Sequence, residues 1–279
     1  MNALPWPLAY TVSADDCRTP VPLGFAAPLA EAVHSLAELG YDGVEVQVRE
    51  PGPGDAEMLE RTVGAAGVGV VGIGTGPVGA QDRLTLTDPS PDVRRHSLDR
   101  LTDAARLAGE LGVPVTLGQT RGTFLPGLAD LQLGWARDAV ARLADVASAH
   151  GSRLLLEPQT RANTSLWNTP DQAVDLIASL TAPVGLVLDT HHLEAEEVDV
   201  LDAVARHAHV TGCLQLAASG TRGPLVLGDP LLPALLNSLH EGGFTGWLTL
   251  EHTQDHNSPL AAARSWTALT DAAAAYGGV

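Results

Sequence analysis

Four polar residues close short apolar runs in the second half of the sequence: Glu157, Asp189, Gln215 and Glu251, separated by 32, 26 and 36 residues. Each interval has about the length of one strand and one helix. If the strands are parallel neighbours in one barrel, their C-terminal ends meet at the same edge. Three carboxylates cannot share a small site without a compensating cation. The spacing therefore predicts an oxygen-ligated divalent metal, and with it an enzyme.

The two glutamates of this set are suited to proton transfer. Glu157 precedes Pro158, so the chain stays extended and the carboxylate is held at the strand end. Glu251 closes the last apolar run, and in a barrel the two strands lie on different sides of the axis. Beside a Lewis acid, such a pair can remove a proton from a carbon next to a carbonyl and return one on the opposite face. The alternative is two surface glutamates.

Asp189 opens the segment Asp189-Thr-His-His192 directly after the sixth apolar run. Asp189 is predicted to be a metal ligand, and His192 a substrate contact or proton donor. The alternative is an aspartate that caps the next helical turn, followed by solvated histidines. Gln215 binds metal less strongly than a carboxylate, but a neutral ligand limits the charge and suits Mn²⁺ or Mg²⁺ more than Zn²⁺. The alternative for Gln215 is a polar residue that points inward and fills the barrel.

Several arginines follow strand ends: Arg49, Arg121, Arg161 and Arg222. In a chain of net charge −17, arginines at the mouth of a barrel indicate a small substrate with a carboxylate or several hydroxyls. Arg222 is the preferred candidate because it shares a loop with Gln215. A surface ion pair is the alternative for each.

Alternating apolar runs and helical segments must position these residues. Strands are predicted near 8–13, 43–48, 68–73, 113–118, 152–157, 184–189, 210–216 and 246–251. Helices are predicted near 27–39, 54–66, 91–111, 130–149, 170–180, 196–206, 229–241 and 258–276. Eight strand–helix pairs without a linker predict an α/β chain that forms a single (β/α)₈ TIM barrel, one domain over residues 1–279.

The longest interruption, 74–90, is expected to cover part of the site. Its Gly74-Thr-Gly-Pro-Val-Gly79 matches a dinucleotide fingerprint, but Pro77 and the residues after it are not expected to open an apolar helix.

Composition excludes several classes of function. All 16 cationic residues are arginine, so Schiff-base and P-loop lysine chemistry is excluded. The net charge argues against nucleic-acid and anionic-membrane partners. No apolar stretch is long enough to span a bilayer, no export signal is visible, and two distant cysteines suit a reducing compartment. We expect a cytoplasmic enzyme that acts on a small molecule and that is either a monomer or a homo-oligomer.

The segments that carry a family resemblance include Gly72-Ile-Gly-Thr-Gly, Val115-Thr-Leu-Gly-Gln-Thr-Arg-Gly, Leu188-Asp-Thr-His-His-Leu and Gly246-Trp-Leu-Thr-Leu-Glu. The chain resembles the xylose isomerase-like superfamily of sugar isomerases and epimerases over nearly its whole length, and within it the ketose and keto-sugar-acid 3-epimerases. The resemblance implies that Glu157, Asp189, Gln215 and Glu251 bind one Mn²⁺ or Mg²⁺ ion. It also implies that Glu157 and Glu251 shuttle protons through a metal-bound cis-enediolate, while His192 and Arg222 hold substrate oxygens.

The chain departs from the epimerase pattern at several positions. The usual histidine of the seventh strand is Gln215, and Arg222 follows it by seven residues, which is similar to the hydroxypyruvate isomerase branch and, for Gln215, to some 3-dehydroshikimate dehydratases. The segment Glu-Pro-Leu-Asn-Arg of the epimerases reads Glu157-Pro-Gln-Thr-Arg161 here.

The predicted function is isomerisation or epimerisation of a small sugar or keto-sugar acid. A hydride shift of the xylose isomerase kind is disfavoured because its polarising lysine has no counterpart. The alternatives are a dehydratase on the same site (3-dehydroshikimate or inosose dehydratase-like), an endonuclease IV-like DNA repair enzyme, which the acidic charge disfavours, and a sugar-binding barrel without catalysis.

Overall fold

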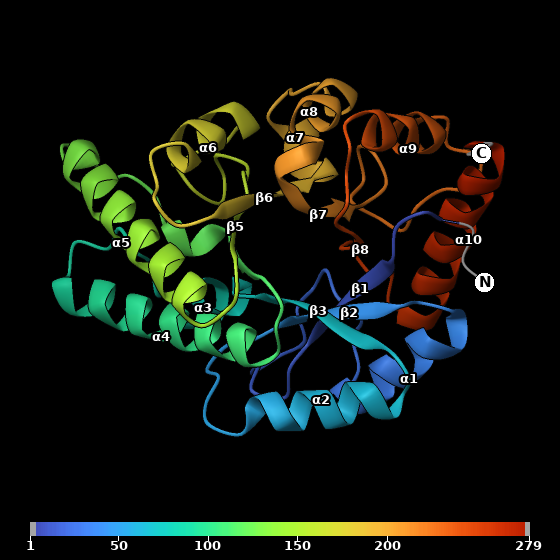
Figure 1. The fold of residues 1–279 in the computed structure, drawn as a ribbon, viewed down its shortest axis with the longest axis horizontal. Coiled ribbons are helices and arrows are strands. Elements are labelled where there is room, and N and C mark those ends of the chain that lie inside the picture. The colour runs from blue at the N-terminus through green and yellow to red at the C-terminus, as the bar shows by residue number, and fades with distance from the viewer. Residues whose placement is uncertain (1–3, 277–279) are drawn as a thin grey trace.

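The structure, a computed structural model, describes residues 4–276 and contains a closed barrel of eight strands in the order β1 to β8 (Figure 1). The strands are β1 (Leu8–Ser13), β2 (Gly43–Gln47), β3 (Gly69–Gly74), β4 (Val115–Leu117), β5 (Leu154–Leu156), β6 (Val184–Asp189), β7 (Thr211–Leu216) and β8 (Trp247–Leu250). Neighbouring strands are parallel, and β8 pairs with β1 to close the ring. The predicted (β/α)₈ barrel is confirmed.

Helices surround the strands (Figure 1). The longer ones are α1 (Leu29–Leu39), α2 (Asp55–Ala65), α4 (Pro91–Glu110), α5 (Ala129–Ala149), α6 (Pro170–Ile177), α8 (Val200–His207), α9 (Leu231–Glu241) and α10 (Ser258–Tyr276). They match the eight predicted segments. The short helices α3 (Gly76–Asp82) and α7 (Thr190–Ala195) and the 3₁₀ turns η1 (Gln119–Arg121) and η2 (Ala208–Val210) were not predicted.

Helix α3 corrects one expectation. A short helix does open after Gly74. Pro77 is tolerated because it stands in the first turn, where its missing N–H would have had no intrahelical partner. The segment is therefore not an irregular loop over its whole length, although it still extends over the site.

The core lies between the barrel and the helices. Strands β1 and β6 are buried at every position, as expected for a parallel sheet covered on both faces. Helix α1 buries Leu29, Ala32, Val33 and Leu36, which recur every three or four residues on one face. Gly40 ends this helix in a left-handed conformation (φ 96°) that glycine adopts without strain.

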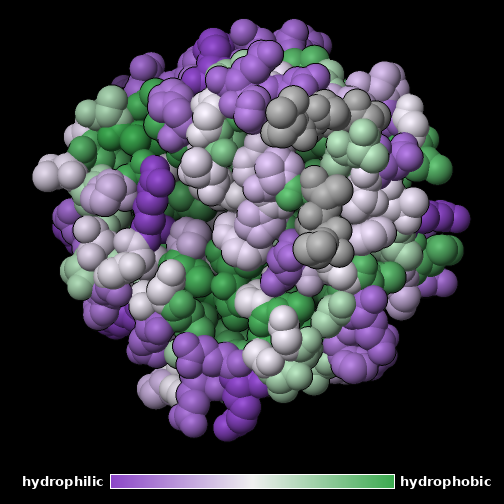
Figure 2. Space-filling model, turned by 45° about the vertical axis from the view of Figure 1, so that its right-hand side comes forward, coloured by the Kyte–Doolittle hydropathy of each residue, from purple (hydrophilic) through white to green (hydrophobic). Residues whose placement is uncertain are grey.

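The face in Figure 2 carries both hydrophilic and hydrophobic residues along its rim, and a hydrophobic area lies below its centre. Within residues 4–276, no helix combines the length and the apolar character that a membrane crossing requires.

Candidate functional site

The four predicted ligands converge at the C-terminal edge of the barrel. Glu157 directly follows β5, Asp189 ends β6, Gln215 is the penultimate residue of β7, and Glu251 directly follows β8. Glu157, Gln215 and Glu251 line one cavity of about 550 Å³, hereafter the main cavity. Asp189 is 1% exposed and contacts His192 and Arg222, which line the same cavity.

Asp189 has two roles at once. Its Oδ1 accepts hydrogen bonds from the backbone N–H groups of His191 (2.8 Å) and His192 (3.4 Å), so it caps helix α7. Its Oδ2 lies 3.0 Å from Arg222 Nη2 and 3.6 Å from His192 Nε2. The capping alternative is therefore realised, and the second oxygen is still directed into the cluster.

His192 lies between two of the carboxylates. Its Nε2 is 3.6 Å from Glu157 Oε1 and from Asp189 Oδ2, and the ligand atoms of the three residues all lie within 4.8 Å of one another. Burial lowers the pKa of His192 to about 4, so the imidazole is neutral at pH 7. His192 thus belongs to the group that could hold a metal, whereas the sequence indicated a substrate contact or a proton donor.

Arg222 neutralises part of the acidic cluster. Its Nη2 lies 3.0 Å from Asp189 Oδ2 and 3.1 Å from Glu251 Oε2. The residue has a left-handed backbone (φ 54°), which is uncommon for a residue with a side chain. Its carbonyl oxygen accepts hydrogen bonds from the backbone N–H (2.9 Å) and the hydroxyl (3.2 Å) of Thr253, which hold this conformation. The loop after β7 is therefore shaped to aim one guanidinium at two carboxylates.

The structure adds Glu45, which the sequence reasoning missed. Glu45 lies in β2, is 2% exposed, and accepts a hydrogen bond from Gln215 Nε2 at 3.0 Å. Gln215 Oε1 is buried and accepts no hydrogen bond within the described part of the chain. A carboxylate at a buried position of an otherwise apolar strand, together with Gln47 two residues later, was the signal that could have found it.

The buried carboxyl groups of the cluster would be stabilised by a bound cation. Burial raises the pKa of Glu45 to about 7, and burial followed by the charge of Asp189 raises that of Glu157 to about 7. The same two causes raise the pKa of Glu251 well above its usual range. Four carboxyl groups thus gather in the cluster, and Arg222 contacts only two of them. The unpartnered Gln215 Oε1 belongs to the same cluster. This donor set fits a divalent, oxygen-ligated ion.

Gly118 makes room for the Glu157 carboxylate. A Cβ at Gly118 would lie 2.5 Å from Glu157 Oε2 and 2.6 Å from Gln159 Nε2. Because the Gln159 amide hydrogen-bonds Glu157, the three residues form one packed unit at the ends of β4 and β5. Gln159, like Glu45, was not singled out from the sequence.

Two predicted substrate contacts are not brought to the main cavity. Arg121 is 0% exposed, and its guanidinium donates to the carbonyl oxygens of Gly118 (2.8 Å), Glu157 (2.5 Å) and Trp167 (3.4 Å). Arg161 is exposed and pairs with Glu196. The reason is local: η1 turns Arg121 inward under the strand ends, where main-chain carbonyls need donors.

The expected cover of the site is present. Residues of 74–90 that line the main cavity are Gly74, Thr75, Gly76, Pro77, Ala80 and Gln81. The loop after β1 lines it with Thr19, Val21, Pro22 and Leu23. The two segments are joined by Arg18, whose Nη2 lies 2.8 Å from Asp82 Oδ1.

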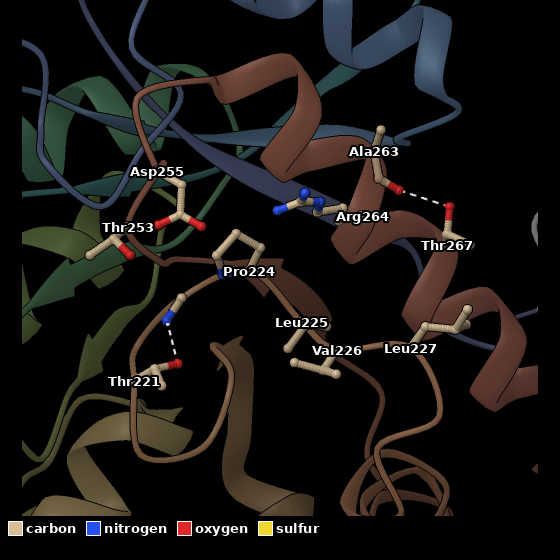
Figure 3. Close-up of a pocket in the computed structure, with 11 residues that line it drawn as sticks. Thr221, Pro224, Leu225, Val226, Leu227, Thr253, Asp255, Ala263, Arg264 and Thr267 are labelled. Atoms are coloured by element: carbon tan, nitrogen blue, oxygen red, sulfur yellow. Dashed lines mark hydrogen bonds between the residues drawn. The ribbon is translucent and has the colours of Figure 1, made fainter.

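A second cavity, of about 720 Å³, lies behind the Arg222 loop (Figure 3). Figure 3 shows the Arg264 side chain extending from α10 into it, with Asp255 and Thr253 on the far side. It is lined by one carboxylate and one guanidinium, both on exposed residues, along with the apolar Leu225, Val226 and Leu227. It lacks a cluster of ligating groups, so the smaller main cavity is the candidate active site.

Comparisons with known proteins show the family and the fold that the chain resembles. Residues 33–272 match the family model described as xylose isomerase-like TIM barrel. A ketose 3-epimerase from Arthrobacter globiformis is 25% identical over 224 residues, which cover 79% of this chain and 76% of that protein. A candidate hydroxypyruvate isomerase from Streptomyces coelicolor is 25% identical over 255 residues, covering 86% and 90%. The structure of D-psicose 3-epimerase from Clostridium cellulolyticum H10 shares the fold, with a TM-score of 0.75 at 18% identity over 96% of this chain and 99% of that one.

Proposed function

The chain belongs to the xylose isomerase-like TIM-barrel family, and we propose that it isomerises or epimerises a small α-hydroxycarbonyl sugar with the help of one divalent metal ion. The observation that carries the proposal is the cluster of the buried Glu45, Glu157 and Asp189 with the partly buried Glu251, in which Arg222 contacts Asp189 and Glu251. The relatives named above are an epimerase and a candidate isomerase, which supports this reaction type over the dehydratase alternative.

Glu157, Asp189, Gln215 and Glu251 would hold the ion, with His192 Nε2 as a further donor close to two of them. A divalent ion, Mn²⁺ or Mg²⁺ by the oxygen-rich donor set, would supply positive charge that stabilises the negative charge developing on the substrate carbonyl oxygen. Its presence would also relieve the repulsion among the carboxylates.

Glu157 and Glu251 would move the protons. They follow β5 and β8, so they approach the cavity from different strands. Burial raises the pKa of Glu157 to about 7 and that of Glu251 well above its usual range, so both carboxyl groups hold a proton more readily than exposed glutamates, which suits groups that remove and return protons. Arg222 and neutral His192 would orient substrate oxygens beside them.

Solvent isotope exchange tests this function. The protein, incubated with Mn²⁺ or Mg²⁺ and with D-fructose, D-tagatose or hydroxypyruvate in D₂O, is expected to place deuterium on the carbon beside the carbonyl, as measured by NMR. Glu157→Gln and Glu251→Gln should each slow exchange by about 10²–10⁴-fold. Glu60→Gln, at an exposed position of α2, is the matched control and should exchange normally.

Three results would reject the proposal. One is the absence of exchange across a panel of ketoses and keto acids. Another is full exchange by Glu251→Gln. The third is accumulation of an unsaturated product, detected by ultraviolet absorbance, which would indicate dehydration.

A further inference from the structure

A side pocket of about 260 Å³ adjoins the main cavity, and both have Gln119 and Asn163 in their walls. Its remaining polar lining comes from Thr85, Thr87 and Asp88, in the segment before α4, from Thr123, in the loop before α5, and from Gln132 in α5. The pocket is therefore formed between two loops at the C-terminal edge of the barrel.

The side pocket opens from the Glu157 side of the site. Gln119 directly follows Gly118, against which the Glu157 carboxylate packs. Arg222 and Glu251, by contrast, come from the ends of β7 and β8. A molecule whose reacting carbonyl lies in the carboxylate cluster would extend past Glu157 toward the side pocket.

Some polar side chains around the two cavities lack protein partners, although Gln119 Nε2 donates a hydrogen bond to the Gly76 carbonyl oxygen at 2.9 Å. Among residues 4–276, the side-chain amide of Asn163 and the hydroxyl of Thr123 take part in no hydrogen bond with another side chain or with the backbone. On the main-cavity side, Gln159 is 8% exposed and its Oε1 is buried without a partner. Since a buried polar atom without a partner is costly, Gln159 and its neighbours are suited to hydrogen bonds from a ligand.

The chemistry of the side pocket selects the type of ligand. Its described lining contains hydroxyls, amides and the Asp88 carboxylate, and no arginine or histidine. A phosphate or carboxylate group would find no positive charge there. A group with several hydroxyls, which can donate and accept hydrogen bonds, would fit amides and hydroxyls.

We propose that the side pocket is a subsite for a second sugar ring, so that the preferred substrate is a keto-disaccharide or glycoside rather than a free monosaccharide. This inference rests on the proposed function for the identity of the reacting carbonyl. Gln119 and Asn163 would lie at the linkage between the two rings, and Thr85 and Thr123 beside the second ring.

The test compares sugars of one and two rings. D-fructose is the one-ring probe, and isomaltulose and lactulose, which contain a ketose unit, are the two-ring probes. Exchange of the carbon-bound hydrogen in D₂O gives kcat/KM, and saturation-transfer NMR gives binding without turnover. At least one two-ring probe is expected to show a kcat/KM at least tenfold above that of D-fructose.

Two variants test whether the side pocket causes the preference for two-ring sugars. Thr123→Phe, which fills the side pocket from an exposed position, and Asn163→Ala, which removes one amide, should each reduce the two-ring to one-ring ratio of kcat/KM about tenfold. Thr267→Phe changes an exposed threonine that lines the separate cavity of Figure 3, and should leave the ratio unchanged.

The two proposals fail in different ways. Exchange of D-fructose with no preference for either two-ring probe, or an unchanged ratio in both side-pocket variants, would overturn the subsite while the proposed function stands. Binding of a two-ring probe that Thr123→Phe weakens, without exchange of any sugar, would support the subsite and reject the proposed function.

Discussion

Gln215 and Glu45 are 170 residues apart in sequence, and the Gln215 amide nitrogen donates a hydrogen bond to the Glu45 carboxylate at 3.0 Å. This bond fixes which end of the amide points away from Glu45. The other end, Oε1, is buried without a partner among the described residues, as a metal ligand would be before the ion binds. Groups that orient a ligand in this way typically change metal affinity when they are removed.

Glu45→Ala is therefore expected to weaken Mn²⁺ binding about 10–100-fold. Glu45→Gln keeps an acceptor for the Gln215 amide and should lose less. Isothermal titration calorimetry with Mn²⁺ gives both affinities. Equal affinity in wild type and Glu45→Ala would show that Glu45 has no part in orienting the ligand.

Asp189→Asn separates the capping role of this residue from its proposed metal role. Asparagine is as good a cap as aspartate, so helix α7 should be retained. For the wild type, Mn²⁺ at 100 times its Kd should raise stability by about 2.7 kcal/mol, or the Tm by about 5–10 °C. Scanning calorimetry with Mn²⁺ and with EDTA should show this rise in wild type and little of it in Asp189→Asn. A full rise in the variant would contradict the ligand assignment.

Gly118→Ala should reduce activity more than stability. The added Cβ meets the ends of two side chains, those of Glu157 and Gln159, which can move, rather than backbone. We expect kcat to fall at least tenfold because the carboxylate is displaced, with a small change in Tm. Gly134→Ala in α5, where a Cβ meets nothing within 4 Å, is the matched control and should be active and slightly more stable. Normal kcat in Gly118→Ala would show that Glu157 tolerates displacement.

Arg121→Leu should act on stability and not on substrate affinity. Its guanidinium is bonded to three main-chain carbonyls in a buried site, and losing these bonds should cost about 3 kcal/mol or more. Thermal unfolding should show a lower Tm, while KM for an accepted sugar should stay within about twofold. Arg161→Ala, at an exposed ion pair, should change neither. A large rise in KM with unchanged Tm would restore Arg121 as a substrate contact.

The metal-free protein should lose stability as the pH rises from 6.5 to 8. Burial raises the pKa of Glu45 and Glu157 from 4.5 to about 7, so the folded state holds more protons than the unfolded state in this window. Stability then falls with rising pH. His192, whose pKa is lowered from 6.5 to about 4, has the opposite effect, but mainly below pH 6.5. Chemical unfolding of the EDTA-treated protein at several pH values measures the slope, which Glu45→Gln should reduce. Rising stability over the window would contradict the assigned carboxyl environments.

The sequence by itself determined the alternation of elements and the placement of Glu157, Asp189, Gln215 and Glu251 at strand ends. Buried parallel strands are continuous apolar runs, so the polar residue that closes each run marks its end. Parallel strands in a barrel bring such ends to one edge, whatever the details of packing. That is why the convergence could be predicted without contacts.

Only the tertiary structure decided how these residues are partnered. Glu45 reaches Gln215 because β2 and β7, three strands apart around the closed barrel, both direct these side chains into its interior, which no local pattern reveals. Arg121 and Arg222 both follow strand ends in sequence, yet one turns inward to carbonyls and the other toward carboxylates. Side-chain direction in loops depends on turn conformation and on distant acceptors such as the Glu157 carbonyl. Spacing therefore predicted where the candidate site lies, and the packing of the structure shows which side chains contact one another there.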